Sequence, residues 1–272
     1  MMRKQTVILL TACISPDEMA FTALQDAGER ERQYIDAINF YIENTHYPIV
    51  FCNNSGEDIS SKITYPKGRV EFLSYYGNDY DKQLGKGYGE FQIIEYAFRN
   101  SQFLSNAHTV IKITGRLKVN HLSLQIKLYR IIYWCLIPYV LISEINIQNR
   151  FACSECIIAE KRFFLDYFLK RNRINDSKNY FFEHQLFDSI IETPYNMQKF
   201  CFPIEIEGFS GTTGAEYSVQ SHSFTDKLQY LRNEVLRLTE LANYNIFQKF
   251  CFGLDAVIIR LVKFVMRHLY QA

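Results

Sequence analysis

Two basic side chains flank a Thr-Gly turn in the stretch Lys112-Ile113-Thr114-Gly115-Arg116. The apolar residues just before it, Thr109-Val110-Ile111, are typical of a buried strand. Ligands of open α/β sheets bind at the carboxyl ends of strands. Lysine offers a point charge there, and arginine a fork of N–H groups that suits phosphate oxygens. We therefore expect Lys112, Thr114, Gly115 and Arg116 to contact an anion, above all a diphosphate. The alternative is that Arg116 pairs with a structural carboxylate.

Small or polar residues also follow the apolar runs at 7–10 and 49–52. Backbone groups and Asn or Ser side chains at strand ends can hydrogen-bond a nucleobase and a ribose. The alternative is that these turns only connect strands. The residues that we expect to bind the ligand at these two ends are Thr11, Ala12, Cys13, Asn53, Asn54 and Ser55.

Three glycines, Gly85, Gly87 and Gly89, precede a predicted helix from about Glu90 to Asn100. Glycine allows backbone amides to approach a phosphate, and the helix N-terminus adds a positive end. Lys86 could meet the same anion. The spacing is neither a dinucleotide fingerprint nor a Walker loop, so a flexible loop is an equal alternative.

Two stretches with acidic residues have the chemistry for metal binding or proton transfer. Asp79-x-Asp81 could hold a divalent cation against a diphosphate, but it lies in a loop, and solvated acids are the better expectation. Glu183 or His184 could act as a general base on a predicted helix, with a salt bridge or helix cap as the alternative. The histidines show no ligand spacing, so no metal site is predicted.

The elements that position these residues alternate along the chain. Apolar spacing predicts the order strand, helix, strand, strand, helix, strand up to residue 113, which favours an α/β fold with a mostly parallel, doubly wound sheet. The chain is then helical almost without interruption from residue 224. We expect a ligand-binding domain over 1–222 and a C-terminal helical extension over 223–272.

Composition excludes several classes of protein. The chain has 272 residues and is 48% hydrophobic and 22% charged, which is the composition of a globular protein. Its formal net charge of +1 gives no overall positive potential that would favour nucleic acid. The 7 cysteines are scattered and follow no secretory signal, which predicts free thiols in a reducing compartment. Cys153-x-x-Cys156 lacks a second pair, and buried structural cysteine is expected.

Two apolar segments raise the question of a membrane. The run at 131–142 contains Pro138 and is shorter than the roughly 20 residues that a span requires, so it is predicted to be buried core. In the tail, Arg260, Lys263 and Arg267 share one helical face opposite apolar residues. Such a helix can lie in a membrane interface, or it can pack on the domain or on a partner subunit.

Four stretches resemble the bacterial glycosyltransferases of GT-A type that make capsular polysaccharide and O-antigen: LLTACISP, VFCNNSG, GKGYGEFQIIEYAF and IKITGR. The resemblance covers roughly the first 120 residues and, weakly, FFEHQLFD and GFSGTTG. It implies a nucleotide-sugar donor bound at the first strand ends. Most such enzymes hold a metal with Asp-x-Asp after the fourth strand, where this chain has Thr114-Gly115-Arg116.

The resemblance implies a hexosyltransferase that inverts the anomeric centre, with a retaining enzyme, in which Glu183 would not be the base, as the alternative. Because the chain departs from Asp-x-Asp at this position, we expect no cofactor, with Mn or Mg as the alternative. Glu183 is then the expected base, and Arg116 stabilises the leaving diphosphate in place of a cation. His184, Ser210 and Thr212 are expected on the acceptor side. The acceptor would be a glycan, in particular a lipid-linked one, and the enzyme would lie at the cytoplasmic face of the inner membrane. The alternatives are a non-catalytic partner in a polysaccharide assembly complex and another nucleotide-dependent transferase.

Overall fold

The computed structural model describes residues 5–16, 19, 22–127, 141–146, 148–193, 197–200, 203–211, 213–217 and 225. Of the apolar run at 131–142, only Leu141 and Ile142 belong to these ranges, and both are buried. The basic tail and nearly all of the predicted extension over 223–272 lie outside them. Among the helices that are described, none has the length and apolar character to cross a membrane.

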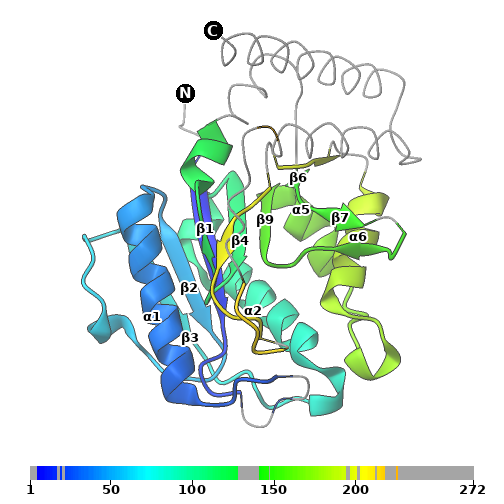
Figure 1. Ribbon diagram of the computed structural model, residues 1–272, viewed down its shortest axis with the longest axis horizontal. Helices are drawn as coiled ribbons and strands as arrows, with labels where there is room; N and C mark the ends of the chain where they lie inside the picture. Colours follow the sequence, from blue (N-terminus) through cyan, green and yellow to red (C-terminus); the bar gives the residue numbers. More distant parts are fainter. Residues whose placement is uncertain are drawn as a thin grey trace, which may run out of the picture.

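A central sheet of seven strands, in the order β10-β6-β9-β4-β1-β2-β3, organises the described residues (Figure 1). Pairs β1–β2, β2–β3, β1–β4 and β6–β10 are parallel, whereas β9 runs antiparallel to both neighbours. The predicted mostly parallel α/β sheet is thus confirmed. The strands span Thr6–Ala12 (β1), Ile49–Asn53 (β2), Val70–Ser74 (β3), Thr109–Thr114 (β4), Leu141–Ile142 (β6), Cys156–Glu160 (β9) and Met197–Gln198 (β10).

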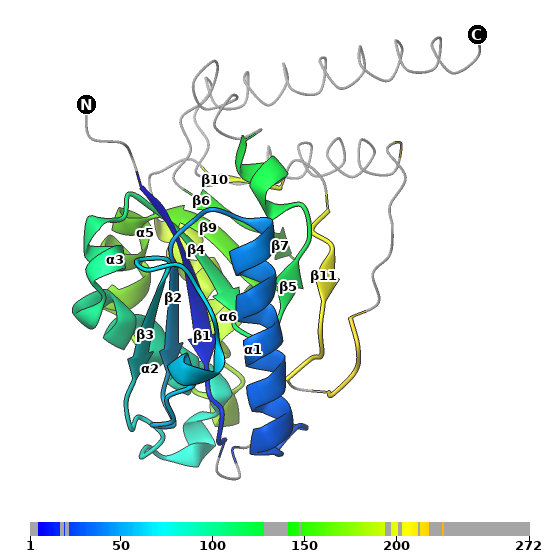
Figure 2. The same cartoon turned by 90° about the vertical axis from the view of Figure 1, so that its left-hand side faces the viewer.

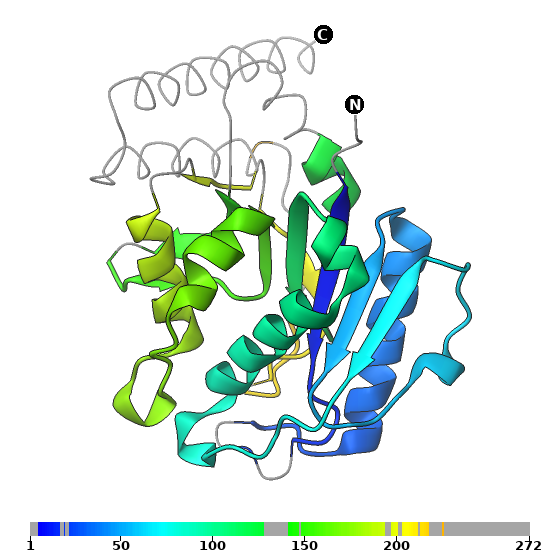
Figure 3. The same ribbon diagram turned by 180° about the vertical axis from the view of Figure 1, so that it is seen from behind.

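Helices cover both faces of this sheet. The helix α1 (Ala27–Asn44) lies on one face (Figure 2), and α2 (Lys86–Asn100) and α3 (Gln102–Asn106) lie on the other (Figure 3). The alternation of β1 explains the two layers, because Val7 and Leu9 pack with α2 whereas Ile8 and Leu10 pack with α1. Two further helices, α5 (Lys161–Asp166) and α6 (Phe182–Glu192), join the α2 side. The predicted doubly wound arrangement is therefore correct.

Short elements complete the frame. The strand pairs β5–β11 and β7–β8 are antiparallel, and β11 brings the loop after it beside the end of β4. Their bounds are Lys118–Val119 (β5), Ile145–Asn146 (β7), Phe151–Ala152 (β8) and Ile206–Glu207 (β11). The 3-10 turns are Ser60–Lys62 (η1), Lys82–Leu84 (η2), Phe168–Lys170 (η3) and Asp176–Lys178 (η4).

Helix α2 begins earlier than its apolar spacing predicts. It starts at Lys86 rather than near Glu90, so that Gly87 and Gly89 lie in its first turn. Its N-cap, Gly85, has φ of 83°, which an L side chain rarely adopts, and offers no capping side chain. The glycine cluster is therefore the start of a helix and not a flexible loop.

Candidate functional site

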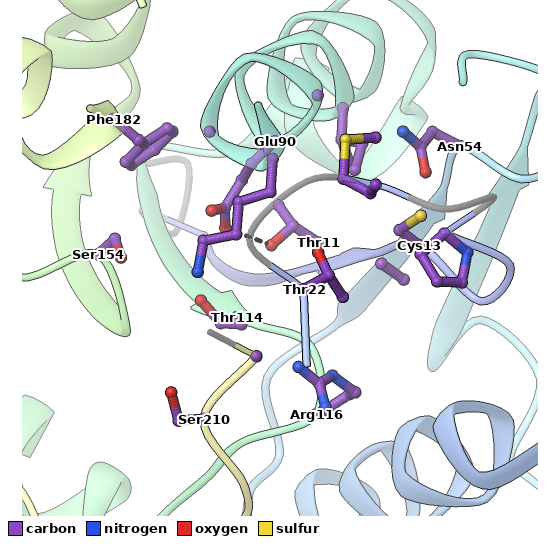
Figure 4. Close-up of a pocket in the computed structure, with 18 of the residues that line it drawn as sticks. Thr11, Cys13, Thr22, Asn54, Glu90, Thr114, Arg116, Ser154, Phe182 and Ser210 are labelled. Atoms are coloured by element: carbon purple, nitrogen blue, oxygen red, sulfur yellow. Dashed lines mark hydrogen bonds between the residues drawn. The ribbon is translucent and has the colours of Figure 1, made fainter. Parts of the chain in front are cut away.

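A pocket lies at the carboxyl ends of β1 and β4, beside the first turns of α2 and α6 (Figure 4). Figure 4 shows Cys13 and Asn54 at one end, Ser154 and Phe182 at the other, and Thr11 and Arg116 between them. Most residues predicted at the strand ends and on the later elements line it: Thr11, Ala12, Cys13, Asn54, Lys86, Thr114, Arg116, Glu183 and Ser210. Distant parts of the sequence thus meet in one place.

Two of the residues that line the pocket are buried arginines. Arg116 and Arg30 are each 5% exposed. Arg116 donates from Nη1 to Oε1 of Gln33 at 2.9 Å, and Arg30 donates to the carbonyl oxygens of Cys13 and Leu24. Within the described ranges, neither guanidinium forms an ion pair with a carboxylate. The alternative of a structural carboxylate for Arg116 is not seen there.

Burial has an electrostatic cost for Arg116. It lowers the pKa of the guanidinium, and the neighbouring charge of Arg30 lowers that pKa further, against an opposing contribution from Tyr34. Positive charge is therefore concentrated at these two guanidinium groups, and no carboxylate of the described residues forms an ion pair with either of them. An anionic ligand would remove this cost.

Lys112 does not line the pocket, although we predicted that it would contact the ligand. Its side chain is fully buried, with Nζ 2.5 Å from Oε1 of Glu90 and 2.6 Å from the carbonyl oxygen of Ser154. Nζ also lies 5.1 Å from the centre of the Phe182 ring. The physical reason is strand alternation, because Lys112 points to the α2 face, as does Val110 two residues earlier. Lys112 therefore positions Glu90 and the Ser154 loop.

Asn53 and Ser55 have structural roles instead of the predicted ligand contacts. The side-chain oxygen of Asn53 accepts hydrogen bonds from the amide of Ile14 at 3.2 Å and from the hydroxyl of Ser55 at 2.8 Å. The hydroxyl of Ser55 in turn accepts from the amides of Ile14 and Ser15. These two side chains therefore join the loops after β1 and β2, and neither lines the pocket.

Asn54 does face the pocket. It is 1% exposed, and its amide nitrogen donates to Oδ1 of Asn78 at 3.1 Å. Its own Oδ1 is buried with no hydrogen-bond partner among the described residues. A buried acceptor of this kind is expected to meet a donor on a ligand.

Gly115 is required by the close approach of two strand ends. Its amide donates to the carbonyl oxygen of Thr11 at 2.9 Å. A Cβ at this position would lie 2.5 Å from that oxygen and 3.1 Å from Cε1 of Tyr34. Gly115 thus contacts backbone and not the pocket, but it sets the positions of its neighbours Thr114 and Arg116.

Gly115→Ala is therefore expected to lower the free energy of unfolding by about 1–3 kcal/mol, because backbone must move to admit the methyl group. Urea denaturation measures this change. Gly28→Ala is the matched control, since a Cβ at Gly28 in α1 meets nothing closer than 3.4 Å and alanine favours a helix. Equal stability of Gly115→Ala and wild type would contradict the steric argument.

Glu90, which sequence reasoning missed, also lines the pocket. It accepts a hydrogen bond from the Thr11 hydroxyl at 2.9 Å, drawn as a dashed line in Figure 4, in addition to its ion pair with Lys112. Thr11 is only 4% exposed, so this hydrogen bond fixes its side chain. The carboxylate of Glu90 thus connects the end of β1 to α2.

Asp176 in η4 was also missed, because it lies in a polar loop far along the chain. Its carboxylate accepts hydrogen bonds from the backbone amides of Lys86 and Gly87 at the start of α2. A Cβ at Gly85 would collide with Oδ2 of Asp176. Asp176 therefore supplies the cap that the N-terminus of α2 lacks locally. Burial, followed by the charge of Glu183, raises the pKa of Asp176 to about 6.

Glu183 lines the pocket from the first turn of α6, as predicted. Its Oε1 accepts a hydrogen bond from the Ser154 hydroxyl at 2.7 Å. Burial raises the pKa of Glu183, and this hydrogen bond opposes the rise. A half-buried carboxylate with a raised pKa suits a general base.

His184 caps α6 and does not line the pocket. Its Nδ1 accepts from the amide of Phe181 at 3.1 Å, and its ring stacks with Tyr180 and Phe181. This geometry matches the helix-cap alternative and gives the predicted acceptor-side role no support. Ser210 lines the pocket, while Thr212 lies outside the described residues.

The residues present do not form a metal centre of the expected kind. The position after β4 holds Thr114-Gly115-Arg116, and a guanidinium repels a cation. Asp79 lines a separate surface groove, and Asp81 caps η2 through the amide of Gln83. Within the described part of the chain, no group of three His, Cys, Asp or Glu side chains could hold a metal ion. Cys153 and Cys156 are free thiols, and the predicted burial holds for Cys156, whereas Cys153 is only partly buried.

No protein-family model matches the sequence, and neither does any curated protein. One similar solved structure is described as a nucleotide-diphospho-sugar transferase from Desulfovibrio desulfuricans G20, with 9% identity, TM-score 0.44, and coverage of 95% of this chain and 98% of that one. The mannosyltransferase Ktr4p from S. cerevisiae has 11% identity, TM-score 0.42, and coverage of 81% and 74%. A protein described as a glucose-1-phosphate thymidylyltransferase from Bacillus anthracis has 8% identity and a TM-score of 0.41, with coverage of 90% of this chain and 98% of that one.

These similarities are confined to the overall arrangement of the chain. Only the pocket therefore bears on the function. Sequence signals for Arg30, Glu90 and Asp176 were weak, since each is one charged residue in an ordinary helix or loop.

Proposed function

We propose that the protein is a glycosyltransferase that moves a hexosyl group from a nucleotide-sugar to a hydroxyl of a glycan. The observation that carries the proposal is the pair of buried arginines, Arg30 and Arg116, which line the pocket at the carboxyl ends of the strands and have no carboxylate partner among the described residues. Lys86, at the start of α2, adds a third cation to its lining. A diphosphate carries the opposite charge and matches a guanidinium fork.

The positions of the residues along the pocket favour one orientation of the donor. The nucleoside would lie toward Cys13 and Asn54, where a donor group of the nucleoside could hydrogen-bond to Oδ1 of Asn54, which has no partner among the described residues. The diphosphate would lie against Arg116, and the sugar would extend toward Ser154 and Glu183. This order places the anomeric carbon between the cations and the carboxylate of Glu183.

The reaction then follows from these groups. Glu183 takes the proton from an acceptor hydroxyl, whose oxygen attacks the anomeric carbon. The bond from that carbon to the diphosphate oxygen breaks, and its electron pair leaves on the phosphate. Arg116 and Arg30 stabilise the negative charge that develops. Attack opposite the leaving group inverts the anomeric centre.

We further propose that transfer needs no divalent cation, because Arg116 stands where an Asp-x-Asp would hold one. A capsular or O-antigen glycan on a lipid carrier is the proposed acceptor. The basic face of residues 260–267 would bring the enzyme to the cytoplasmic membrane surface that carries such a lipid.

A panel of nucleoside diphosphates tests the proposal by thermal shift. One of them, at about 100 times its dissociation constant, should raise Tm by roughly 5 °C in EDTA as well as in Mg²⁺ or Mn²⁺. A shift that appears only with the metal would contradict cation-independent binding.

No shift with any nucleoside diphosphate would favour a non-catalytic partner in polysaccharide assembly. Labelled nucleotide-sugars then identify the reaction, since release of the free nucleoside diphosphate with a glycosylated product separates a glycosyltransferase from other nucleotide-dependent transferases.

A further inference from the structure

Four carboxylates line the pocket. Glu155 accepts a hydrogen bond from the Tyr217 hydroxyl, and the other three, those of Glu90, Asp176 and Glu183, are coupled because the charge of Glu183 interacts with those of both Glu90 and Asp176. They come from α2, η4 and α6. Glu90 lies near Ser154 and away from Asn54 in Figure 4. If the diphosphate binds at the arginines, as the proposed function requires, the transferred sugar is the part of the donor that meets these acids. The inference below therefore rests on the proposed function.

Asp176 has acceptor capacity that the protein itself does not use. The side chain is 5% exposed, and its carboxylate already accepts from the amides of Lys86 and Gly87. Oδ1 is buried with no hydrogen-bond partner in the described part of the molecule. A buried carboxylate oxygen in a pocket is stable only when a donor reaches it. The hydroxyl groups of a sugar are such donors.

The charge at this part of the pocket remains negative after its internal pairs are counted. Among the described residues, Glu90 forms an ion pair with Lys112 alone, and Lys112 also donates to the carbonyl oxygen of Ser154. Lys86 faces both Asp176 and Glu183 and lowers the pKa of each. One cation thus stands against two carboxylates, which already repel each other. A further negative charge on the sugar would be unfavourable here.

We propose that Oδ1 of Asp176 accepts a hydrogen bond from a hydroxyl of the transferred sugar, and that Asp176 thereby selects a neutral hexose over a hexuronate. Asparagine at this position keeps one oxygen for the amides of α2. Its NH₂ group then replaces the charged oxygen and can donate to a carboxylate. Asp176→Asn should therefore change the charge preference of the sugar subsite and leave the nucleotide subsite intact.

Calorimetric titration with two sets of ligands tests this charge preference. One set is UDP, UDP-glucose and UDP-glucuronate, and the other is GDP, GDP-mannose and GDP-mannuronate. Wild type should bind the neutral nucleotide-sugar at least about tenfold more tightly than the uronate. In Asp176→Asn this ratio should fall below about threefold, mainly through tighter uronate binding, with the affinity for the free diphosphate within twofold. Asp79→Asn, an exposed acid outside the pocket, should keep the wild-type ratio.

Equal affinity of wild type for the two sugars, or an unchanged ratio in Asp176→Asn, would overturn the inference while UDP or GDP binding still supports the proposed function. Loss of binding to UDP and GDP alike in the wild type would instead refute the diphosphate site, and the inference with it. If Asp176→Asn melts well below wild type, Asp176→Ser provides a second neutral variant. The preference of wild type for the neutral nucleotide-sugar over the uronate can be measured without any variant, and its absence would by itself overturn the inference.

Discussion

Arg116→Ala is expected to lower kcat/KM by about 100-fold or more and to abolish most of the thermal shift caused by a nucleoside diphosphate. Removing one member of a buried, hydrogen-bonded charge pair costs about 2–5 kcal/mol, which corresponds to roughly 30-fold to several thousandfold. Arg116 is 5% exposed and lines the pocket at the end of β4, so the pair with a diphosphate would be well shielded from water.

The same substitution should not destabilise the free protein through lost charge pairing. Burial and Arg30 lower the pKa of Arg116, which means that the folded protein disfavours its charged form. Arg116→Met keeps much of the apolar stem and should melt near the wild-type temperature while losing the diphosphate shift. Arg116→Lys keeps a charge without the fork and should be intermediate.

Arg99→Ala is the matched control for Arg116→Ala, because the Arg99 side chain on α2 is 72% exposed and away from the pocket. It should retain full activity. Wild-type turnover by Arg116→Ala would refute the assignment of the diphosphate to this arginine.

Glu183→Gln is expected to lower kcat by about 10²–10⁴-fold with little change in donor affinity, because glutamine keeps the shape and removes the base. The pKa of Glu183 is raised by burial, so the wild-type rate should increase with pH through a value above that of an ordinary glutamate. This acidic limb should be missing in Glu183→Gln. Steady-state kinetics across pH 4–9 measures both effects.

Ser154→Ala tests the direction of the pKa shift of Glu183. The Ser154 hydroxyl donates to Glu183 and lowers its pKa, so its removal should move the acidic limb to higher pH. Glu192→Gln, an exposed acid at the other end of α6, should behave as wild type. A Glu183→Gln enzyme with unchanged kcat, or a product that retains the anomeric configuration, would contradict the base role.

Much of the fold followed from local pattern. The apolar runs at 7–10, 49–52 and 109–113 are buried strands whose ends meet at one edge, because parallel strands share a direction. The antiparallel direction of β9 was not predictable, since a buried strand reads the same in either direction. The start of α2 was misplaced because its first turn is glycine-rich and its cap, Asp176, lies 90 positions further along the chain.

The sequence alone determined that polar strand ends, Arg116 and Glu183 would be available for chemistry, because strand alternation and helix spacing are local properties. It did not determine how charges pair. Lys112 and Arg116 have similar chemistry and lie four positions apart in the chain. Only the tertiary structure places Lys112 against Glu90 and leaves Arg116 beside Arg30 in the pocket, because pairing depends on which buried carboxylates the fold brings within reach.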